Sequence, residues 1–282
     1  MPAGGPGRMS VSFLVNGRPG ESVPAGDRGL AFGDGVFRTL RVRGARPLNW
    51  ERHLRRLAHD CAALGIVAPD EAVLRGEIGR VAPGDAIAKV IVTRGISERG
   101  YSVPVDPVPT RIVAAYSPAA YPAELAREGV RVRRCALVLS EQPRLAGVKT
   151  LCRLENVLAR AEWSDPLIRE GLLCDAAGRL IEGTMSNVFL VSHGIVVTPG
   201  LTRCGVAGAQ RERVLDIARA LGCACEVRDV AFEELARADE VFLTNSLIGL
   251  WPVAALEGTS WHPGPLTRRL QEQVEADDAR GA

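Results

Sequence analysis

A short proline-containing stretch at residues 117–122, Ser-Pro-Ala-Ala-Tyr-Pro, constrains the fold more than any other feature of the sequence. Proline has no backbone N–H and restricts the residue before it, so a regular helix or central strand cannot cross this stretch. Strong secondary-structure patterns lie on both sides of it. The sequence therefore predicts two α/β domains, residues 1–118 and 123–282, with a linker at residues 119–122.

The first domain has alternating strand patterns and two helical patterns. Residues 11–15 alternate as a strand and end at Asn16-Gly17, a strong hairpin-turn signal. A glycine-rich stretch at residues 27–35 precedes the next strand, because glycine permits tight turns and close backbone contacts. The periodicity predicts a strand at 36–42, helices at 49–65 and 70–81, and strands at 86–94 and 111–116.

The second domain combines the same two kinds of pattern. We expect strands at 129–140, 226–230 and 240–244, a strand meander at 171–199, and helices at 151–163, 211–221, 232–237 and 265–276. Helices and strands are mixed in both halves, so the fold class is α/β (α+β).

Composition excludes several function classes. The chain has 46% apolar and 24% charged residues and a net charge of +2, which argue against a nucleic-acid or membrane partner held by bulk charge. Residues 1–8 resemble a loose tail rather than a signal peptide, and Met9 is a possible second start. The seven cysteines are scattered, with no histidine at metal-ligand spacing. We therefore expect a cytoplasmic protein with buried, reduced thiols and no metal.

Lysine is unusually scarce in this chain. Only Lys89 and Lys149 accompany the arginines among its 35 basic residues. Arginine stays protonated in proteins, whereas burial or a nearby cation can turn lysine into a neutral amine. Chemistry that needs a side-chain amine, such as Schiff-base formation, must therefore use one of these two residues.

The two lysines differ in their settings. Lys149 follows the turn-rich residues 143–147 and precedes an apolar run with helical spacing, which places it at a loop-to-helix junction. Lys89 lies within a strand pattern. A solvated surface charge is the ordinary role of a lysine, and we assign that role to Lys89. Lys149 is the candidate for amine chemistry.

Other residues favour a phosphorylated partner for this lysine. Glu182 ends an apolar segment beside Gly183, where a half-buried carboxylate would need a partner. The glycine-rich residues 202–210 lead into a helix whose N-terminus suits a phosphate, although glycines also precede many helices as caps. Arginines at 52–56 and in the loop 94–102 could bind anions. A lysine, a carboxylate and a phosphate-ready helix start together fit pyridoxal 5'-phosphate.

A set of motifs in this order resembles the fold-type IV, or class IV, pyridoxal-phosphate enzymes, which include branched-chain and D-amino-acid aminotransferases. The similarity covers about residues 11–253. The motifs are Phe-Gly-Asp-Gly-Val-Phe at 32–37, His-Leu-Arg-Arg-Leu at 53–57, Arg-Gly at 94–95 with Arg-Gly-Tyr-Ser at 99–102, Gly-Val-Lys at 147–149, Ile-Glu at 181–182, Ser-Asn-Val-Phe at 186–189, Gly-Val at 205–206 and Asn-Ser-Leu at 245–247.

This resemblance implies roles for individual residues. Lys149 would hold the cofactor covalently, and Glu182 would pair with its pyridine nitrogen. The cofactor phosphate would be bound by Arg56, by the backbone of Val206 and Ala207, and by Ser246. The resemblance also implies a two-domain architecture with the cofactor between the domains. A small-molecule substrate and a homodimer with partner loops closing each site are implied as well.

Three positions resemble the 4-amino-4-deoxychorismate lyases within this family. Thr39 matches their catalytic threonine, and Arg99 and Asn245 match positions for substrate recognition. Arg38 and Cys152 depart from the pattern, standing where a threonine and an asparagine occur, and their effect on substrate choice stays open. The resemblance implies conversion of 4-amino-4-deoxychorismate to 4-aminobenzoate and pyruvate. A D- or branched-chain amino-acid aminotransferase and a non-catalytic cofactor-binding protein are the alternatives.

Overall fold

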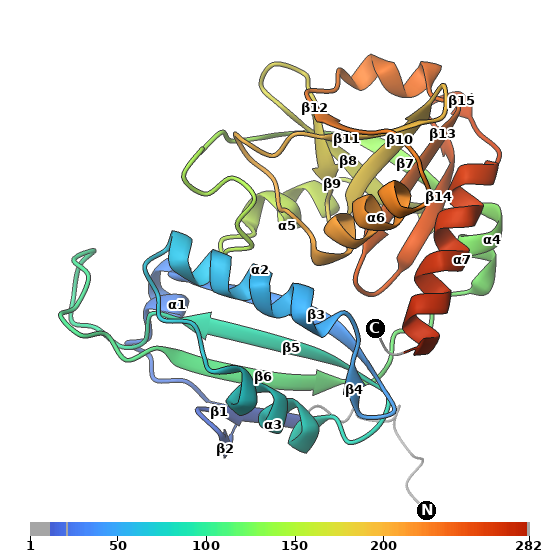
Figure 1. The fold of residues 1–282 in the computed structure, drawn as a ribbon. Helices are drawn as coiled ribbons and strands as arrows, with labels where there is room; N and C mark the ends of the chain where they lie inside the picture. The colour runs from blue at the N-terminus through green and yellow to red at the C-terminus, as the bar shows by residue number, and fades with distance from the viewer. Residues whose placement is uncertain (1–11, 21, 281–282) are drawn as a thin grey trace, which may run out of the picture.

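The computed structural model describes residues 12–20 and 22–280 and has two sheets, one above the other in Figure 1. The expected N-terminal tail and the start of the first strand at Val11 lie outside the described residues. The fold is mixed α+β, as predicted. Residues 117–122 connect the last strand of the smaller sheet to the first helix of the second half.

The smaller sheet is antiparallel, with the strand order β2-β1-β6-β5-β3-β4. Helices α2 and α3 share one apolar core with its buried face, as the alternating pattern of β3 requires. Its elements are β1 (Ser12–Val15), β2 (Arg18–Pro19), α1 (Arg28–Phe32), β3 (Gly35–Arg43), β4 (Arg46–Pro47), α2 (Trp50–Ala63), α3 (Glu71–Val81), β5 (Ala86–Thr93) and β6 (Thr110–Tyr116).

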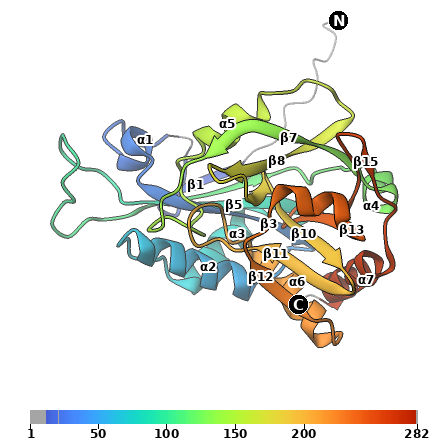
Figure 2. The ribbon, with the colours of Figure 1, turned by 90° about the horizontal axis from the view of Figure 1, so that it is seen from above.

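The larger sheet has the order β12-β11-β10-β13-β14-β7-β8-β9, with β15 beside β14. It curls so that β9 also contacts β10 and β11, while α6 and α7 cover β13 (Figure 2). Its elements are α4 (Ala123–Glu128), β7 (Val130–Leu139), α5 (Leu154–Arg160), β8 (Ile168–Asp175), β9 (Leu180–Gly183), β10 (Asn187–Ser192), β11 (Ile195–Pro199), α6 (Ala209–Ala220), β12 (Cys225–Arg228), the 3₁₀ helix η1 (Phe232–Arg237), β13 (Glu240–Asn245), β14 (Gly249–Leu256), β15 (Thr259–Ser260) and α7 (Pro265–Arg280).

The prediction of a helix at residues 151–163 was wrong at both ends, because α5 covers only Leu154–Arg160. Residues 150 and 151 are hydrogen-bonded to β3 instead: Thr150 forms a β-bridge with Val36, and the N–H of Leu151 donates to the carbonyl of Gly35 over 2.9 Å. Lys149 therefore lies in an extended segment five residues before α5. The long strand β14 and helices α1 and α4 were not predicted.

The glycine-rich stretch is built around a carboxylate. Asp34 accepts hydrogen bonds from Nε of Arg28 (2.8 Å) and from Nε and Nη2 of Arg94 (2.7 and 3.0 Å). Although burial opposes it, these two guanidinium groups lower the pKa of Asp34. Gly33, at φ 67°, caps α1 in the left-handed region. The ion pairs of Asp34 with Arg28 and Arg94 therefore fix the residues just before β3, the strand that carries Thr39.

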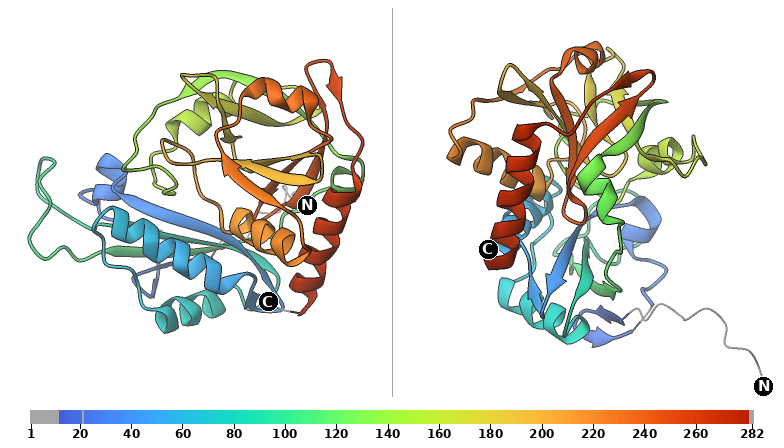
Figure 3. Two further views of the ribbon diagram at one scale, coloured as in Figure 1. Left: turned by 45° about the horizontal axis from the view of Figure 1, so that its top comes forward. Right: turned by 90° about the vertical axis from the view of Figure 1, so that its right-hand side faces the viewer.

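Helix α7 contacts both halves of the molecule. It descends from the larger sheet beside α6 toward the smaller sheet (Figure 3). There Asp278 accepts hydrogen bonds from Arg41 of β3 and from Nη1 of Arg213 in α6, the latter over 2.6 Å. Arg213 and Asp278 are both buried. This ion-pair network ties the end of the chain to the surface between the two sheets.

Candidate active site

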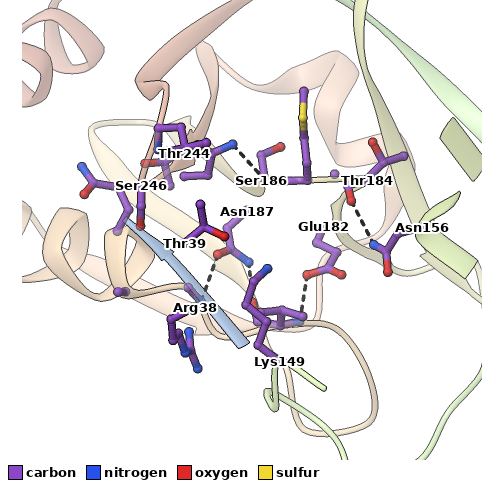
Figure 4. Close-up of a pocket in the computed structure, with 18 of the residues that line it drawn as sticks. Arg38, Thr39, Lys149, Asn156, Glu182, Thr184, Ser186, Asn187, Thr244 and Ser246 are labelled. Carbon is purple, nitrogen blue, oxygen red and sulfur yellow. Dashed lines mark hydrogen bonds between the residues drawn. The ribbon is translucent and has the colours of Figure 1, made fainter. Parts of the chain in front are cut away.

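A cavity of about 300 Å³ lies between the two sheets. The smaller sheet contributes Phe37, Arg38 and Thr39 of β3, and the larger one contributes β9 and β13 with the turns that follow them. The remaining lining residues are His53, Tyr121, Lys149, Arg153, Asn156, Glu182 to Asn187, Val206, Gly208 to Gln210, and Thr244 to Leu247. Figure 4 shows ten of these side chains labelled around the cavity, with Lys149 between Thr39 and Glu182.

The backbone of Lys149 is fixed from two sides. Its carbonyl accepts from the N–H of Phe37 over 3.1 Å, and its N–H donates to Oδ2 of Asp60 in α2 over 3.2 Å. Gly147, at φ 77°, donates to the carbonyl of Gly205 over 2.9 Å. The lysine segment is therefore hydrogen-bonded to both halves of the molecule.

The environment of the Lys149 amine lowers its pKa to about 8, so a larger share of it is neutral near neutral pH than for an exposed lysine. Nζ lies 4.6 Å from the centroid of the Phe37 ring. Burial, followed by the positive charge of Arg38, lowers the pKa of Lys149. A neutral amine can attack a carbonyl carbon or accept a proton, whereas an ammonium group can do neither.

Glu182 is a buried carboxyl group at the end of β9. Oε2 accepts from the N–H of Val206 over 2.8 Å, and burial raises the pKa of Glu182. The group can therefore hold or share a proton near neutral pH. A cationic ring nitrogen placed beside it would favour the carboxylate instead, because an opposite charge compensates for the burial.

The expected anion site lies at the start of α6. The first intrahelical bond of α6 runs from the N–H of Glu212 to the carbonyl of Gly208, so the N–H groups before Glu212 point out of the first turn. Two expected donors make other contacts: Val206 donates to Glu182, and the N–H of Ala207 donates to the carbonyl of Gly147 over 3.0 Å.

Side chains at this end of the cavity are buried and incompletely bonded. Oγ of Ser246 lies 3.2 Å from Nε2 of His53. Burial, with a smaller effect of Arg38, lowers the pKa of His53 to about 3, so its ring is neutral. Among the described residues, Nδ1 of His53 and Nε2 of Gln210 are buried without a hydrogen-bond partner. Such groups fit a site completed by a polar ligand.

Arg56 lies behind this end of the cavity. Its Nη2 donates to the carbonyl of Gly147 over 2.9 Å and lies 3.8 Å from Asp60. The neighbouring arginines point to α6, where Arg55 pairs with Glu212 and Arg52 with Asp216. A guanidinium beside the Gly147 turn and a helix N-terminus fit a phosphate at this end.

The expected substrate residues lie in different places. Thr39 and Asn245 line the cavity, but the Asn245 side chain also holds the wall: Nδ2 donates to the carbonyl of Met185 over 3.0 Å, and Oδ1 accepts from two N–H groups of the next turn. Arg99 is exposed in the projecting loop between β5 and β6, outside the cavity lining of its own chain. Cys152 is also exposed, contrary to our expectation of buried thiols.

Sequence reasoning treated Lys89 as an ordinary surface charge, and the structure gives it a different position. Lys89 is paired with Thr39 across β5 and β3, and its Nζ lies 5.0 Å from the Phe37 ring that Lys149 also approaches. Burial lowers the pKa of Lys89. Strand register could have revealed this, because cross-strand partners lie on the same face of the sheet, so Lys89 shares the face of Thr39, although it does not line the cavity itself.

Sequence reasoning also missed Glu170 of β8, which is almost fully buried next to Glu182. Oε1 accepts from the N–H groups of Gly171 (2.9 Å) and Thr184 (3.0 Å) and from the Thr184 hydroxyl. Oε2 accepts from the N–H of Met185 (3.2 Å) and from Oγ of Ser186 (2.7 Å). This single carboxylate holds the turn after β9, which forms one wall of the cavity.

Two further properties concern the described part of the chain. Its helices are too short or too polar to cross a membrane. Within residues 12–20 and 22–280, no three His, Cys, Asp or Glu side chains come together as a metal-binding group.

Comparisons with known proteins agree with this geometry. The family model described as amino-transferase class IV matches residues 35–256. The aminodeoxychorismate lyase of Vibrio harveyi is 34% identical over 265 residues, covering 92% of this chain and 98% of the relative. The D-alanine aminotransferase of Bacillus licheniformis is 29% identical, covering 94% and 96%. The crystal structure of 4-amino-4-deoxychorismate lyase from Pseudomonas aeruginosa has 49% identity and a TM-score of 0.91, covering 94% of this chain and 98% of that one.

Replacing Glu170 with glutamine tests its role in holding the cavity wall. Three of the five donors to the carboxylate are backbone N–H groups, which cannot accept, so the amide NH₂ of a glutamine must face at least one N–H and leave it unsatisfied. We expect Glu170→Gln to lose roughly 1–3 kcal/mol of unfolding free energy, measured by urea denaturation. Glu233→Gln, at an exposed site, is the control and should change stability by less than about 0.5 kcal/mol. Equal stabilities of the two variants would contradict this role.

Proposed function

The chain belongs to the class IV aminotransferase family, and we propose that it is a lyase that converts 4-amino-4-deoxychorismate to 4-aminobenzoate, a folate precursor, and pyruvate. The observation that carries the proposal is the presence of Lys149, Glu182 and Thr39 on one cavity: an amine, a carboxyl group and a hydroxyl group. The lyases of Vibrio harveyi and Pseudomonas aeruginosa, which are similar over nearly the whole chain, support this assignment.

Members of this family are pyridoxal-phosphate enzymes. We propose that this cofactor binds with its phosphate between Arg56 and the start of α6, near the backbone of Val206 and Ala207 and the hydroxyl of Ser246. Lys149 would hold its aldehyde carbon and Glu182 its ring nitrogen. The cofactor, when bound, supplies an electron sink for a carbanion at the carbon that loses its proton.

The residues of this chain then divide the proton transfers. Lys149, as a free amine, would accept the ring C4 proton of the substrate, because burial and the charge of Arg38 lower its pKa to about 8. Glu182 would face the ring nitrogen of the bound cofactor and stabilise its proton. Thr39 donates a proton to the enolpyruvyl oxygen as that group leaves. Aromatisation of the substrate ring makes the elimination favourable, so no second keto acid is required.

Cationic groups around the cavity fit a substrate that carries carboxylates. Lys89 shares the Phe37 ring with Lys149 and is paired with Thr39 in the sheet. We propose that its ammonium group, with Asn245, binds the substrate on the Thr39 side. Neither the amine of Lys89 nor the guanidinium of Arg99 forms an ion pair among the described residues. Both are therefore available to an anionic substrate.

An exposed apolar face supports a homodimer. Leu154, Val157 and Leu158 of α5 are 75%, 60% and 60% exposed, and Leu30 beside α5 is 69% exposed. Leu30, Leu154 and Val157 line a groove between α1 and α5. Large contiguous apolar surface usually marks an interface. In a symmetric dimer through this face, the loop with Arg99 would reach the cavity of the partner.

We also propose a cytoplasmic location, which the seven free cysteines support. The rival function is that of a D- or branched-chain amino-acid aminotransferase, as the similarity to a D-alanine aminotransferase suggests. The two activities differ in their products: a lyase releases pyruvate and 4-aminobenzoate without a keto acid, whereas an aminotransferase needs one.

A product assay with the purified holoenzyme tests the lyase directly. We expect wild-type protein to form equal amounts of pyruvate and 4-aminobenzoate from 4-amino-4-deoxychorismate. Lys149→Ala should reduce kcat at least about 1,000-fold, and Thr39→Val about 100-fold, because each loses a proton-transfer group. Thr39→Ser, which keeps the hydroxyl, is the matched control. Amino-group exchange that depends on a keto acid, with no 4-aminobenzoate, would support the aminotransferase.

The role of Lys89 is tested by the split between KM and kcat. We expect Lys89→Met to raise KM about 10-fold, the equivalent of about 1.4 kcal/mol, with little change in kcat, because a binding charge is lost. Lys89→Arg keeps the charge and should lie closer to wild type. An unchanged KM in Lys89→Met would rule out this binding role.

Subunit mixing tests whether Arg99 acts across the dimer. Lys149→Ala and Arg99→Ala should each be nearly inactive alone. In a mixed dimer, one cavity combines an intact Lys149 with an intact Arg99 of the partner subunit. Random assembly should therefore restore about a quarter of wild-type activity after co-expression. No recovery in dimers shown to be mixed would place Arg99 in the cavity of its own chain.

A further inference from the structure

Arg38 occupies a position where an apolar side chain is expected. It lies on β3 between Val36 and Leu40, which pack in the core beneath α2, and only 3% of its surface is exposed. Thr39, the next residue, lies on the opposite face of the strand and lines the cavity, which Arg38 also borders (Figure 4). A buried ion pair in an apolar layer is costly to desolvate, and apolar replacements are often equally stable. Stability alone is therefore a weak explanation for a charge at this position.

The partner of Arg38 is the fully buried Asp60 of α2. Oδ2 of Asp60 accepts both from Nη2 of Arg38 and from the backbone N–H of Lys149, the latter over 3.2 Å. Nη2 of Arg38 also lies 3.3 Å from the carbonyl of Arg56, to which it donates. One ion pair thus joins β3, α2 and the peptide group of the lysine.

We propose that the Arg38–Asp60 pair is a positioning device for the amine of Lys149. Asp60 fixes the lysine backbone, and Arg38 places a permanent positive charge near the amine that disfavours its protonated form. The inference rests on the proposed function in one respect only: it takes Lys149 as the reactive amine. Arg38 acts through Lys149 and need not touch the substrate.

The charges around Lys149 come from several elements. Two cations oppose protonation of the amine: Arg38 of β3 and Arg153, which lies just before α5. Two carboxyl groups favour protonation: Glu182 of β9 and Asp60 of α2. His53 of α2 is neutral. After burial, Arg38 has the largest influence in lowering the pKa of Lys149. Removing Arg38 should therefore raise this pKa, and removing Asp60 should lower it.

The scarcity of lysine permits a direct measurement. Reductive methylation of the apoenzyme with ¹³C-formaldehyde labels only Lys89, Lys149 and the terminal amine. The ¹³C chemical shift of each methylated amine reports its titration, and Lys89→Arg assigns the signals. This readout needs neither cofactor nor substrate. A failed lyase assay with a shifted Lys149 titration would therefore reject the proposed function while leaving the positioning role intact.

We expect the Lys149 midpoint to rise by about one to three pH units in Arg38→Met, because the charge of Asp60 is then unopposed. Asp60→Asn should lower it. The Lys149 midpoint of the double variant should lie between those of Arg38→Met and wild type. The double variant removes both charges of the ion pair together, so it can be tested if Arg38→Met alone does not fold. Arg43→Met, at an exposed position of the same strand, should leave the Lys149 midpoint unchanged. The Lys89 midpoint should stay at its wild-type value in every variant that keeps this lysine. An unchanged Lys149 midpoint in folded Arg38→Met, or equal midpoints in Asp60→Asn and the folded double variant, would overturn the proposal.

Discussion

The structure depends on the way in which the lysine segment is held between the two sheets. Lys149 is hydrogen-bonded through its carbonyl to β3 and through its N–H to Asp60, while Gly147 is hydrogen-bonded to Gly205 of the larger half. Because these contacts are made by the backbone, the side chain stays free for chemistry. An amine placed in this way is shielded from water, and its ammonium form loses hydration. The same backbone contacts therefore set both the position of the Lys149 amine and its burial, which lowers its pKa.

Buried charges around the cavity are stabilised by very different means. Burial raises the pKa of both Glu170 and Glu182. Glu170 accepts from five donors, which oppose this effect of burial and bind its carboxyl group to the turn after β9. Glu182 accepts one hydrogen bond from the N–H of Val206, so it can respond to a charged ring. The number of donors distinguishes the two groups, although both are almost fully buried.

Local sequence patterns predicted most helices and strands of this fold, but they did not predict which buried side chains come together. The periodicity of α2 and α3 and the alternation of β3, β5 and β6 were visible because each element buries one face. The helix predicted at 151–163 was too long because residues 150 and 151 bond to β3, which is distant in the sequence. The scarcity of lysine drew attention to Lys149, and a strand-end position drew attention to Glu182. Nothing local distinguished Lys89, Glu170 or the pairing of Arg38 with Asp60, since each depends on which strand or helix becomes its neighbour.

The ion-pair network of α7 has a consequence for how the molecule is assembled. Asp278 links Arg41 of β3 to Arg213 of α6, yet every strand of both sheets precedes it in the chain. During synthesis each half can form its own core before this carboxylate emerges, and domains generally fold as units in order of synthesis. Arg41 and Arg213 gain their shared partner only after the strands of both sheets have been synthesised. The relative orientation of the halves, and with it the shape of the cavity between them, is therefore secured after each half can form its own core.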